Sequence, residues 1–350
     1  MHKITGVCLL LLGVIGCRVG PNYKRPAMHP PDQLYAQTVP QSESIADLAW
    51  WELFKDPVLQ SLIKEALNNN YDVMTAAARV EQSRAQAGIA RSIYFPQVGY
   101  GAGVGGERSP LAANHTYYSY NFNLDWELDL WGRVRRLNEQ QRALFFSSED
   151  VQRGVWLSLV SDVAQSYFEL RALDAELDIA RETGKGFQQT YELFNKKLEG
   201  GAASGLETSR AEGAWANVLA QIPDLGRQIT AKEDQISLLL GRNPGPIPRG
   251  KSLTDQYDVD VIPAGLPSTL LERRPDFRAA EQQLVAANAA VGVAKADFFP
   301  KITLTGLLGG VSPQLSGLVS SGTQWSVAGG LAGPLFNGGR LKSQYRYRVA

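Results

Sequence analysis

Hydrophobic spacing changes period at two points along the chain. Two alanine-rich stretches, 72–96 and 276–300, have the apolar spacing of a helix and end at an aromatic residue and a proline. Proline lacks a backbone donor and clashes with the preceding turn, so we expect each helix to end there. Beyond each proline, apolar and polar residues alternate, which is the period of a β-strand. The chain is therefore predicted to be mainly α-helical, with strands after two of its helices.

The two stretches are copies of one unit, because residues 72–98 and 276–302 align at a constant offset without a gap. The shared residues are Asp72, Ala76, Ala85, Gly88, Ala90, Phe95 and Pro96 in the first copy, and Asp276, Ala280, Ala289, Gly292, Ala294, Phe299 and Pro300 in the second. Self-similarity at a fixed spacing indicates structural repeats. We predict a first repeat over 57–242, a linker at 243–271 and a second repeat over 272–350.

The predicted strands of the first copy, at about 97–107 and 116–130, have one apolar and one polar face. The apolar face of the second strand carries Tyr118, Tyr120, Phe122, Leu124, Trp126 and Leu128, and the polar face carries Asn121, Asn123, Asp125, Glu127 and Asp129. Strands of about ten residues with aromatic ends are typical of outer-membrane barrels. We assign Asn121, Asn123, Asp125 and Glu127 to a barrel lumen. A half-buried soluble hairpin is the alternative.

The second copy predicts two further strands, near 302–308 and 325–335. Four strands cannot close a barrel, and open edges would leave unpaired backbone groups in lipid. A membrane location for these strands therefore requires several chains to share one barrel. No apolar run reaches the roughly 18 residues that a spanning helix needs.

Between the two strand pairs the sequence predicts a helical hairpin at 133–240. No proline occurs from 133 to 198, which at about 1.5 Å per residue gives about 100 Å of helix. Its apolar residues alternate steps of four and three, the spacing of a coiled coil. Glycines at 200, 201 and 205 are expected to end the first helix. Pro223 interrupts the second, where it costs about 3 kcal/mol or forces a kink.

The N-terminus has the features of a lipoprotein signal. Lys3 precedes an apolar stretch at 4–16 that is too short to span a membrane, and the stretch ends in Val14-Ile15-Gly16-Cys17. This ending resembles the lipobox, so we predict that 1–16 is removed and that Cys17 receives diacylglycerol and an N-acyl chain. A plain signal peptide with an incidental cysteine is the alternative. Residues 17–56 would form a lipid-anchored extended segment.

Composition excludes several functions. The 35 basic and 35 acidic residues balance, so nothing indicates nucleic-acid binding. Only three histidines occur, and no nucleophile or base accompanies the carboxylates of the strand, so we do not expect an enzyme or a metal cofactor. Residues 101–106 fit a dinucleotide fingerprint, but that motif needs a helix directly after it, and here it lies inside a strand.

Several blocks of sequence form longer motifs. They are Cys17 to Pro26, Trp50-Trp51 with Phe54 and Asp56-Pro57, Asp129 to Arg133, Gly265 to Asp276, Phe298 to Pro300, and Pro334 to Arg340. In these blocks the chain resembles the TolC-like outer-membrane efflux lipoproteins of the NodT type, which belong to RND efflux systems. The resemblance extends over residues 17–350.

The resemblance implies a homotrimer in which each chain contributes four strands to a 12-stranded outer-membrane β-barrel. The barrel would be continuous with a periplasmic α-helical tunnel. It also implies a periplasmic adaptor and an inner-membrane RND-type pump as partners, and passive export of drugs or other small toxic compounds. The duct of a type I protein secretion system shares this architecture and is the alternative, together with a poreless coiled-coil spacer.

The resemblance further implies that the hairpin tip contacts the adaptor and forms part of the channel aperture. The matching residues are Gly200, Ser204, Leu206 and Glu207, with Glu207 in the place of the family's usual Asp. A purely structural interpretation is open as well, since Gly200 can form the turn and Ser204 with Glu207 can cap a helix.

The repeat also predicts how the second copy should continue. In the first copy, Arg133 is followed by the whole helical hairpin, whereas the equivalent Arg340 is followed by 341–350. By the repeat's own spacing, roughly 95 residues would be needed to complete a second hairpin. We therefore expect the second repeat to be truncated before its hairpin, and a non-functional fragment is a further alternative.

Overall fold

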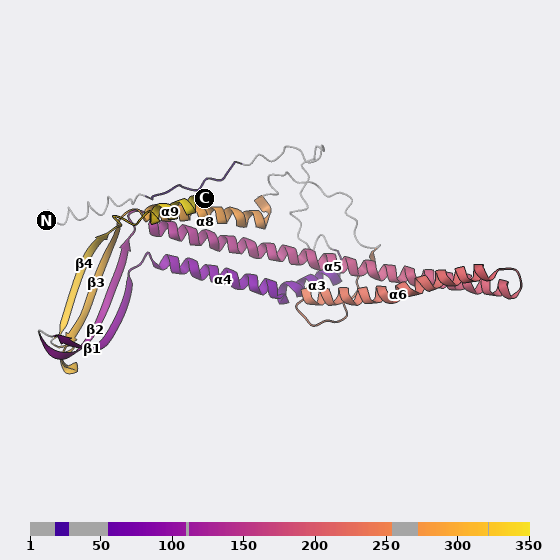
Figure 1. The fold of residues 1–350 in the computed structure, drawn as a ribbon, viewed down its shortest axis with the longest axis horizontal. Helices are drawn as coiled ribbons and strands as arrows, with labels where there is room; N and C mark the ends of the chain where they lie inside the picture. The colour runs from indigo at the N-terminus through magenta and orange to yellow at the C-terminus, as the bar shows by residue number, and fades with distance from the viewer. Residues whose placement is uncertain (1–17, 28–54, 110–111, 254–271, 321) are drawn as a thin grey trace. The chain divides into compact units, whose positions relative to one another are not determined.

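The computed structural model describes residues 18–27, 55–109, 112–253, 272–320 and 322–350 (Figure 1), with the side chains of 107–115 left out. The chain divides into two compact units: unit 1 is Met1–Met28, Arg79–Asp150 and Asp276–Ala350, and unit 2 is His29–Ala78 and Val151–Pro275. The predicted signal peptide 1–16 and Cys17 lie outside the described residues, as do 28–54 of the predicted extended segment and 254–271 of the predicted linker.

Unit 1 contains one antiparallel sheet. Its strands are β1 (Gln97–Ser109), β2 (Ala112–Leu128), β3 (Lys301–Ser312) and β4 (Thr323–Ala332), in the order β1-β2-β3-β4 (Figure 1). The strands follow the two prolines, as the change of period predicts. β2 ends at Leu128 rather than 130, because the Asp129 carboxylate turns back to accept hydrogen bonds from the first turn of the next helix.

The helices that precede the strands confirm the repeat. α4 (Tyr71–Ser92) and α8 (Pro275–Ala296) are both 22 residues long, and each leads to its strand through a short link. The links are 93–96 and 297–300. After the strands, α5 (Arg133–Glu199) and α9 (Arg340–Val349) both begin directly behind a glycine with positive φ, Gly132 at 78° and Gly339 at 84°.

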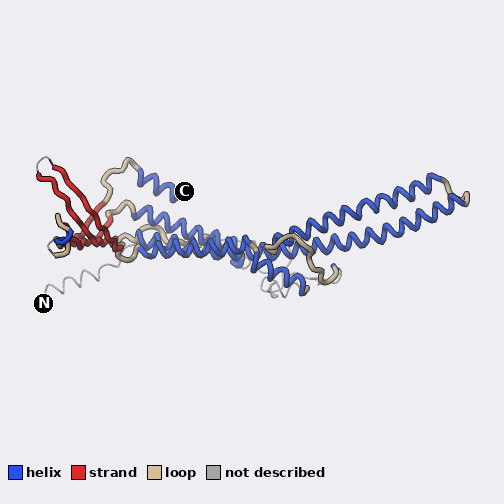
Figure 2. The backbone as a smooth tube through the Cα atoms, turned by 90° about the horizontal axis from the view of Figure 1, so that it is seen from below, coloured by secondary structure: helices blue, strands red, loops and turns tan. Residues whose placement is uncertain are grey.

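Unit 2 contains the helical hairpin formed by α6 (Gly205–Leu239) and the part of α5 from Val151 onward, which lie side by side and antiparallel (Figure 2). The rings of Tyr191 and Trp215 stack across the two helices with centroids 5.7 Å apart. Pro223 does not break α6, which continues through it as one helix. Proline lacks an N–H, so the helix contains one backbone hydrogen bond fewer at this point.

The core of unit 2 lies where α3 (Pro57–Asn69) packs against α5 and α6. It includes Leu59, Leu62, Ile63, Val163, Tyr167, Leu170, Ile236 and Leu240. Asp56 is the N-cap of α3 and accepts from the Val58 N–H at 2.9 Å. The Tyr167 hydroxyl donates to the same carboxylate at 2.9 Å and accepts from the Gly250 N–H at 2.8 Å. Burial and this bond to Asp56 raise the pKa of Tyr167 to about 12.

In unit 1, small residues allow the helices to approach closely. α8 buries Ala279, Ala286, Ala289, Ala290 and Ala294. The Ser147 hydroxyl of α5 donates to the Ala279 carbonyl at 3.0 Å, and Asn138 donates to the Ala90 carbonyl of α4 at 2.8 Å. A short 3-10 helix, Leu315–Gly317, lies between β3 and β4.

Within the described part of the chain, none of the helices combines the length and the apolar character needed to cross a membrane.

Candidate functional site

The polar face of the sheet brings the predicted lumen residues together. Antiparallel partners point to the same side. Asn121 pairs with Gly101 on one side and Gly309 on the other, and Asp125 pairs with Thr305. Asn123 donates to Asp125 at 3.4 Å. Three of the predicted residues, Asn121, Asn123 and Asp125, therefore share a face on which most neighbours are small or polar, with Leu307 opposite Asn123 as an apolar exception.

Glycines in β1 make room for the asparagines. A Cβ added at Gly99 would lie 2.9 Å from the Asn123 Oδ1, and one added at Gly101 would lie 2.8 Å from the Asn121 Oδ1. A side chain at either position would displace an amide. The glycine-rich run at 101–106 lies inside β1 and is paired with β2, in agreement with its interpretation as strand rather than nucleotide site.

The opposite face of the sheet is apolar and largely exposed. Tyr100 is 86% exposed, Trp325 75% and Leu331 70%. The face continues across all four strands through Val98, Val104, Phe122, Leu308 and Val327. A contiguous exposed apolar surface of this kind marks a membrane or a protein partner.

Glu127, the fourth predicted lumen residue, lies at the end of β2 in an ion pair. Arg133 donates to its two carboxylate oxygens through Nε at 2.7 Å and Nη2 at 2.6 Å, and both side chains are 19% exposed. The hydrogen bond to Glu127 raises the pKa of the Arg133 guanidinium. The charge of Glu127 is therefore balanced locally, which separates it from Asp125.

The N-terminal segment 18–27 is held against unit 1 by a buried arginine. Arg136 has no exposed surface and donates to the Val19 carbonyl at 3.3 Å, the Gly20 carbonyl at 3.1 Å and the Asn22 Oδ1 at 2.9 Å. A Cβ added at Gly292 would lie 2.8 Å from the Arg136 Cδ, so this close approach requires a glycine. The role of Arg136 could not be predicted from the sequence, because nothing in its local spacing indicates burial.

Farther along the segment, side chains fix it to α8. The Tyr23 hydroxyl donates to the Glu281 carboxylate at 3.2 Å, and Arg25 forms an ion pair with the same carboxylate at 3.0 Å. Asn288 donates to the Pro21 carbonyl at 3.0 Å. The motif at 18–26 is thus a docking sequence whose contacts begin one residue after Cys17.

The hairpin tip places Gly200, Ser204, Leu206 and Glu207 together. The turn residue proper is Gly201, with φ of 73°, and the Ala202 N–H closes the helix end on the Lys197 carbonyl at 2.7 Å. Positive φ is the usual geometry for a glycine at this position. Leu206 is 62% exposed, although it is apolar.

Ser204 and Glu207 form a reciprocal capping box at the start of α6. The Glu207 N–H donates to the Ser204 Oγ at 3.4 Å, and the Ser204 N–H donates to the Glu207 carboxylate at 2.8 Å. The backbone and hydroxyl of Ser204 lower the pKa of Glu207. The structural interpretation of Ser204 and Glu207 is therefore correct, and Leu206 between them is an exposed apolar group.

No cluster of three or more histidine, cysteine or carboxylate side chains suited to a metal ion occurs among the residues that the structure describes.

The sequence matches the profile of the outer membrane efflux protein family over residues 62–242 and 266–350. The cation efflux system protein CusC of Escherichia coli is 34% identical over 345 residues, which cover 97% of this chain and 75% of CusC. The toluene efflux pump outer membrane protein TtgF of Pseudomonas putida is 34% identical over 359 residues, covering 97% of this chain and 74% of TtgF.

Solved structures agree with the sequence comparison. A crystal structure of CusC superposes with a TM-score of 0.86 at 32% identity, over 95% of this chain and 76% of that one. The open state of the Neisseria gonorrhoeae MtrE outer membrane channel gives 0.86 at 31% identity, over 95% and 76%.

The chain belongs to the outer membrane efflux protein family. It has the fold of TolC-like outer-membrane channels, mainly helical with a strand sheet, and it is the outer-membrane channel component of an efflux pump. The resemblance to TolC-like outer-membrane efflux channels is confirmed.

Proposed function

We propose that three copies of this chain share one 12-stranded barrel in the outer membrane and provide a passive exit for small toxic compounds. The observation that carries the proposal is the two-faced sheet, with an exposed apolar face and a face of mostly small and polar residues. β1 and β4 are the outer strands of this sheet. Pairing β4 of one chain with β1 of the next would satisfy both edges and enclose the polar face.

The helices would extend this conduit into the periplasm, where an adaptor protein and an inner-membrane RND-type pump complete the system. Leu206 at the hairpin tip supports an adaptor contact, because it is exposed without a role in the turn. The channel itself would carry out no chemistry and need no cofactor. Small organic compounds and metal cations are the candidate cargo classes, given the names of the relatives TtgF and CusC.

We also propose that Cys17 carries diacylglycerol and an N-acyl chain. Support comes from the docked segment next to it. Arg18 packs against Gly132, where an added Cβ would lie 3.1 Å from the Arg18 Cα, and the Val19 N–H donates to the Trp131 carbonyl at 3.1 Å. Residue 18 is therefore held at the junction between β2 and α5, which is where the strands would leave the bilayer.

The channel proposal is tested by conductance in planar bilayers and by drug or metal susceptibility of a deletion strain. Asp125 on the polar face should favour cations, so Asp125→Asn should reduce the cation-to-anion permeability ratio because it removes one charge per chain from the pore wall. Asp224→Asn, a matched change on the exposed surface of α6, should leave the ratio unchanged. Absence of conductance, or unchanged susceptibility together with lost protein secretion, would contradict the proposal.

A further inference from the structure

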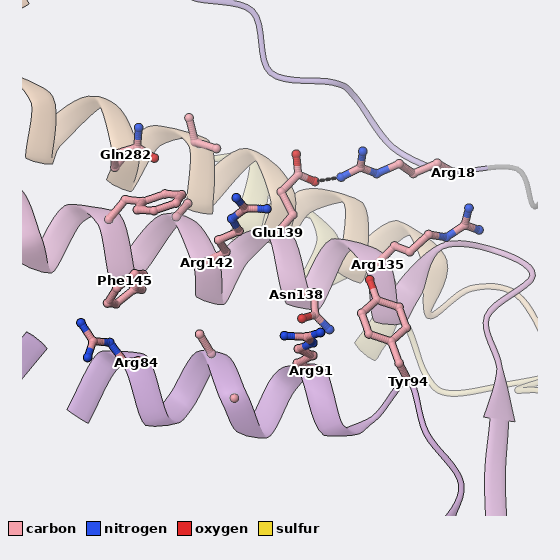
Figure 3. A pocket seen from close by; sticks show the side chains of 15 residues that line it. Arg18, Arg84, Arg91, Tyr94, Arg135, Asn138, Glu139, Arg142, Phe145 and Gln282 are labelled. Carbon is pink, nitrogen blue, oxygen red and sulfur yellow. Dashed lines mark hydrogen bonds and ion pairs between the residues drawn. The ribbon is translucent and has the colours of Figure 1, made fainter. Parts of the chain in front are cut away.

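A cavity of about 1010 Å³ opens in unit 1 beside the junction of sheet and helices (Figure 3). Its walls come from α4, the first turns of α5, α8 and the N-terminal segment. Five arginines line it: Arg18, Arg84, Arg91, Arg135 and Arg142. Glu139 is the one carboxylate among the lining residues. We call this space the arginine cavity.

The single carboxylate cannot balance the arginines, because it is already shared. Glu139 accepts from Arg18 within the cavity (Figure 3). It also accepts from the buried Arg136 at 2.9 Å. Arg135 pairs at 3.1 Å with Asp129, which is not a lining residue. Arg84 pairs with Glu81 at 2.8 Å, but both side chains are more than half exposed. Exposed pairs of that kind contribute little.

Two arginines keep an uncompensated charge. Among the described residues, neither Arg91 nor Arg142 has a carboxylate partner. The Arg142 guanidinium lies over the Phe146 ring, 5.3 Å from its centroid, which orders the group without neutralising it. Tyr94 adds a polar hydroxyl to the lining, and burial together with Asp129 raises its pKa, so the hydroxyl remains protonated as a hydrogen-bond donor.

The two repeats differ at equivalent glycines: the space beside Gly88 of α4 is open, whereas the space beside Gly292 of α8 is occupied. At Gly292 of α8, an added Cβ would meet Arg136, and the Gly20 backbone passes directly over Gly292. At the equivalent Gly88 of α4, which lines the arginine cavity, nothing lies within 4 Å of an added Cβ. The second repeat therefore holds a chain segment at the position where the first repeat leaves room for a ligand.

We propose that the arginine cavity binds the phosphate of an acidic phospholipid headgroup. Arginine recognises phosphate through paired N–H donors, and arginines without a carboxylate partner favour an anionic headgroup over a zwitterionic one. Tyr94 comes shortly before β1 and Arg135 shortly after β2, so the cavity begins at the end of the sheet. Arg18 adjoins the predicted lipid-bearing Cys17. The inference rests on the proposed membrane location of the sheet, which places the cavity at the headgroup layer.

The test measures equilibrium binding of short-chain phosphatidylglycerol to the purified chain in detergent. Phosphatidylethanolamine serves as the zwitterionic comparison and inorganic phosphate as the soluble anion. The unmodified chain should bind phosphatidylglycerol at least several-fold more tightly than phosphatidylethanolamine. R91Q/R142Q should weaken phosphatidylglycerol binding on the order of twentyfold, given the usual contribution of a basic residue near a lipid phosphate.

Two further variants separate binding from folding. G88L fills the cavity without changing its charge and should also abolish binding, with helical content by circular dichroism unchanged. R181Q/R227Q removes two arginines from exposed positions in α5 and α6 outside the cavity and should bind as the unmodified chain does. Equal affinity for the two lipids, or binding that survives both R91Q/R142Q and G88L, would overturn the proposal.

The same assay distinguishes a lipid phosphate from free inorganic phosphate as the ligand of the cavity. Millimolar inorganic phosphate should not displace the lipid; displacement at that concentration would overturn the lipid assignment in favour of a soluble anion. Conductance of the unmodified chain is measured separately. Lipid binding without conductance would refute the channel proposal alone, and conductance without selective lipid binding would refute the present proposal alone.

Discussion

Gly292 and Gly88 are equivalent in sequence, yet their surroundings differ, and this difference predicts opposite effects of one substitution. Gly292→Ala forces a Cβ to within 2.8 Å of Arg136, which is wholly buried and cannot move away without losing its bonds to the N-terminal segment. Overpacking of this kind costs about 1–3 kcal/mol. Gly88→Ala meets open space, and alanine favours a helix over glycine by up to about 1 kcal/mol.

Trypsin cleavage at Lys24 and chemical unfolding both report on this pair. Gly292→Ala should release the segment, so that cleavage accelerates and the free energy of unfolding falls. Gly88→Ala is its matched control and should leave cleavage unchanged, with equal or higher stability. Similar behaviour of the two variants would show that Arg136 does not hold the segment as described.

Tyr167 makes a contribution to the stability of unit 2 that is lost at alkaline pH. Its pKa is about 12 in the folded chain against 10 for an ordinary tyrosine, so its contribution is complete below pH 10 and is lost as the pH rises toward 12. Tyr167→Phe leaves Asp56 and the Gly250 N–H without this partner and should cost about 1–3 kcal/mol at neutral pH.

Unfolding measured from pH 8 to 12 tests this prediction through the difference between variants. The difference in the free energy of unfolding between the unmodified chain and Tyr167→Phe should become smaller above pH 10. Tyr71→Phe, at a residue that is 72% exposed, is the control and should show no gap at any pH. A gap that stays constant up to pH 12 would contradict the assignment.

Individual residues also show where sequence reasoning stops. The alternation of polar and apolar positions was enough to place Asn121, Asn123 and Asp125 on one face. It could not predict that Glu127, on the same face, pairs with Arg133. That pair depends on the turn at 129–132 and on the positive φ of Gly132, which bring a helix start back over a strand end. The alternation of polar and apolar residues along a strand does not predict contacts across such a turn.

Among the elements, the hairpin tip combines a structural and a proposed binding role that substitutions can separate. Glu207→Gln keeps a side chain that can still accept from the Ser204 N–H, but it removes the charge. Ser204→Ala removes the cap and should cost about 1 kcal/mol. The lowered pKa of Glu207 adds a pH signature, since its contribution is present above the ordinary carboxyl range and is lost as the pH falls through the lowered value.

The protection of the Glu207 and Thr208 amides, taken as the intrinsic exchange rate at each pH divided by the observed rate, should therefore fall in Ser204→Ala, and in the unmodified chain at acidic pH. Glu207→Gln should exchange nearly as the unmodified chain does at neutral pH. If efflux activity nevertheless falls in Glu207→Gln, the charge of Glu207 contributes to binding a partner and not to the helix cap. Unaltered efflux in Glu207→Gln, with reduced efflux in Leu206→Ser, would assign the contact to the apolar residue instead.

The elements themselves were largely predictable, for a physical reason. Prolines and glycines at 96, 132, 200 and 300 mark the ends of helices, and long segments between them have one period each. The remaining errors lie at ends decided by side-chain capping, as at Asp129. Pro223 shows the opposite case, in which the packing of a long hairpin keeps a helix continuous through a residue that disfavours it.

At the scale of the whole molecule, the repeat made the order of helices and strands predictable, whereas the docking of 18–27 was not. The docked segment has no period and forms no regular element. Its position depends on the buried guanidinium of Arg136, on the absence of a side chain at Gly292 and on side-chain contacts with α8, none of which a periodic pattern encodes. The arginine cavity could not be predicted from the sequence either, because its five arginines come from three segments that are far apart along the chain and come together only when the helices pack.

The two outer strands of the sheet, β1 and β4, have a genetic consequence under the proposed arrangement. In a closed ring every subunit uses both of its edges, so a single defective copy leaves a gap that its neighbours cannot close. When intact and edge-defective alleles are expressed equally and mix at random, only about one trimeric ring in eight contains three intact subunits. A proline substituted in β4 should therefore be dominant in a strain carrying both alleles, with drug tolerance far below half of normal.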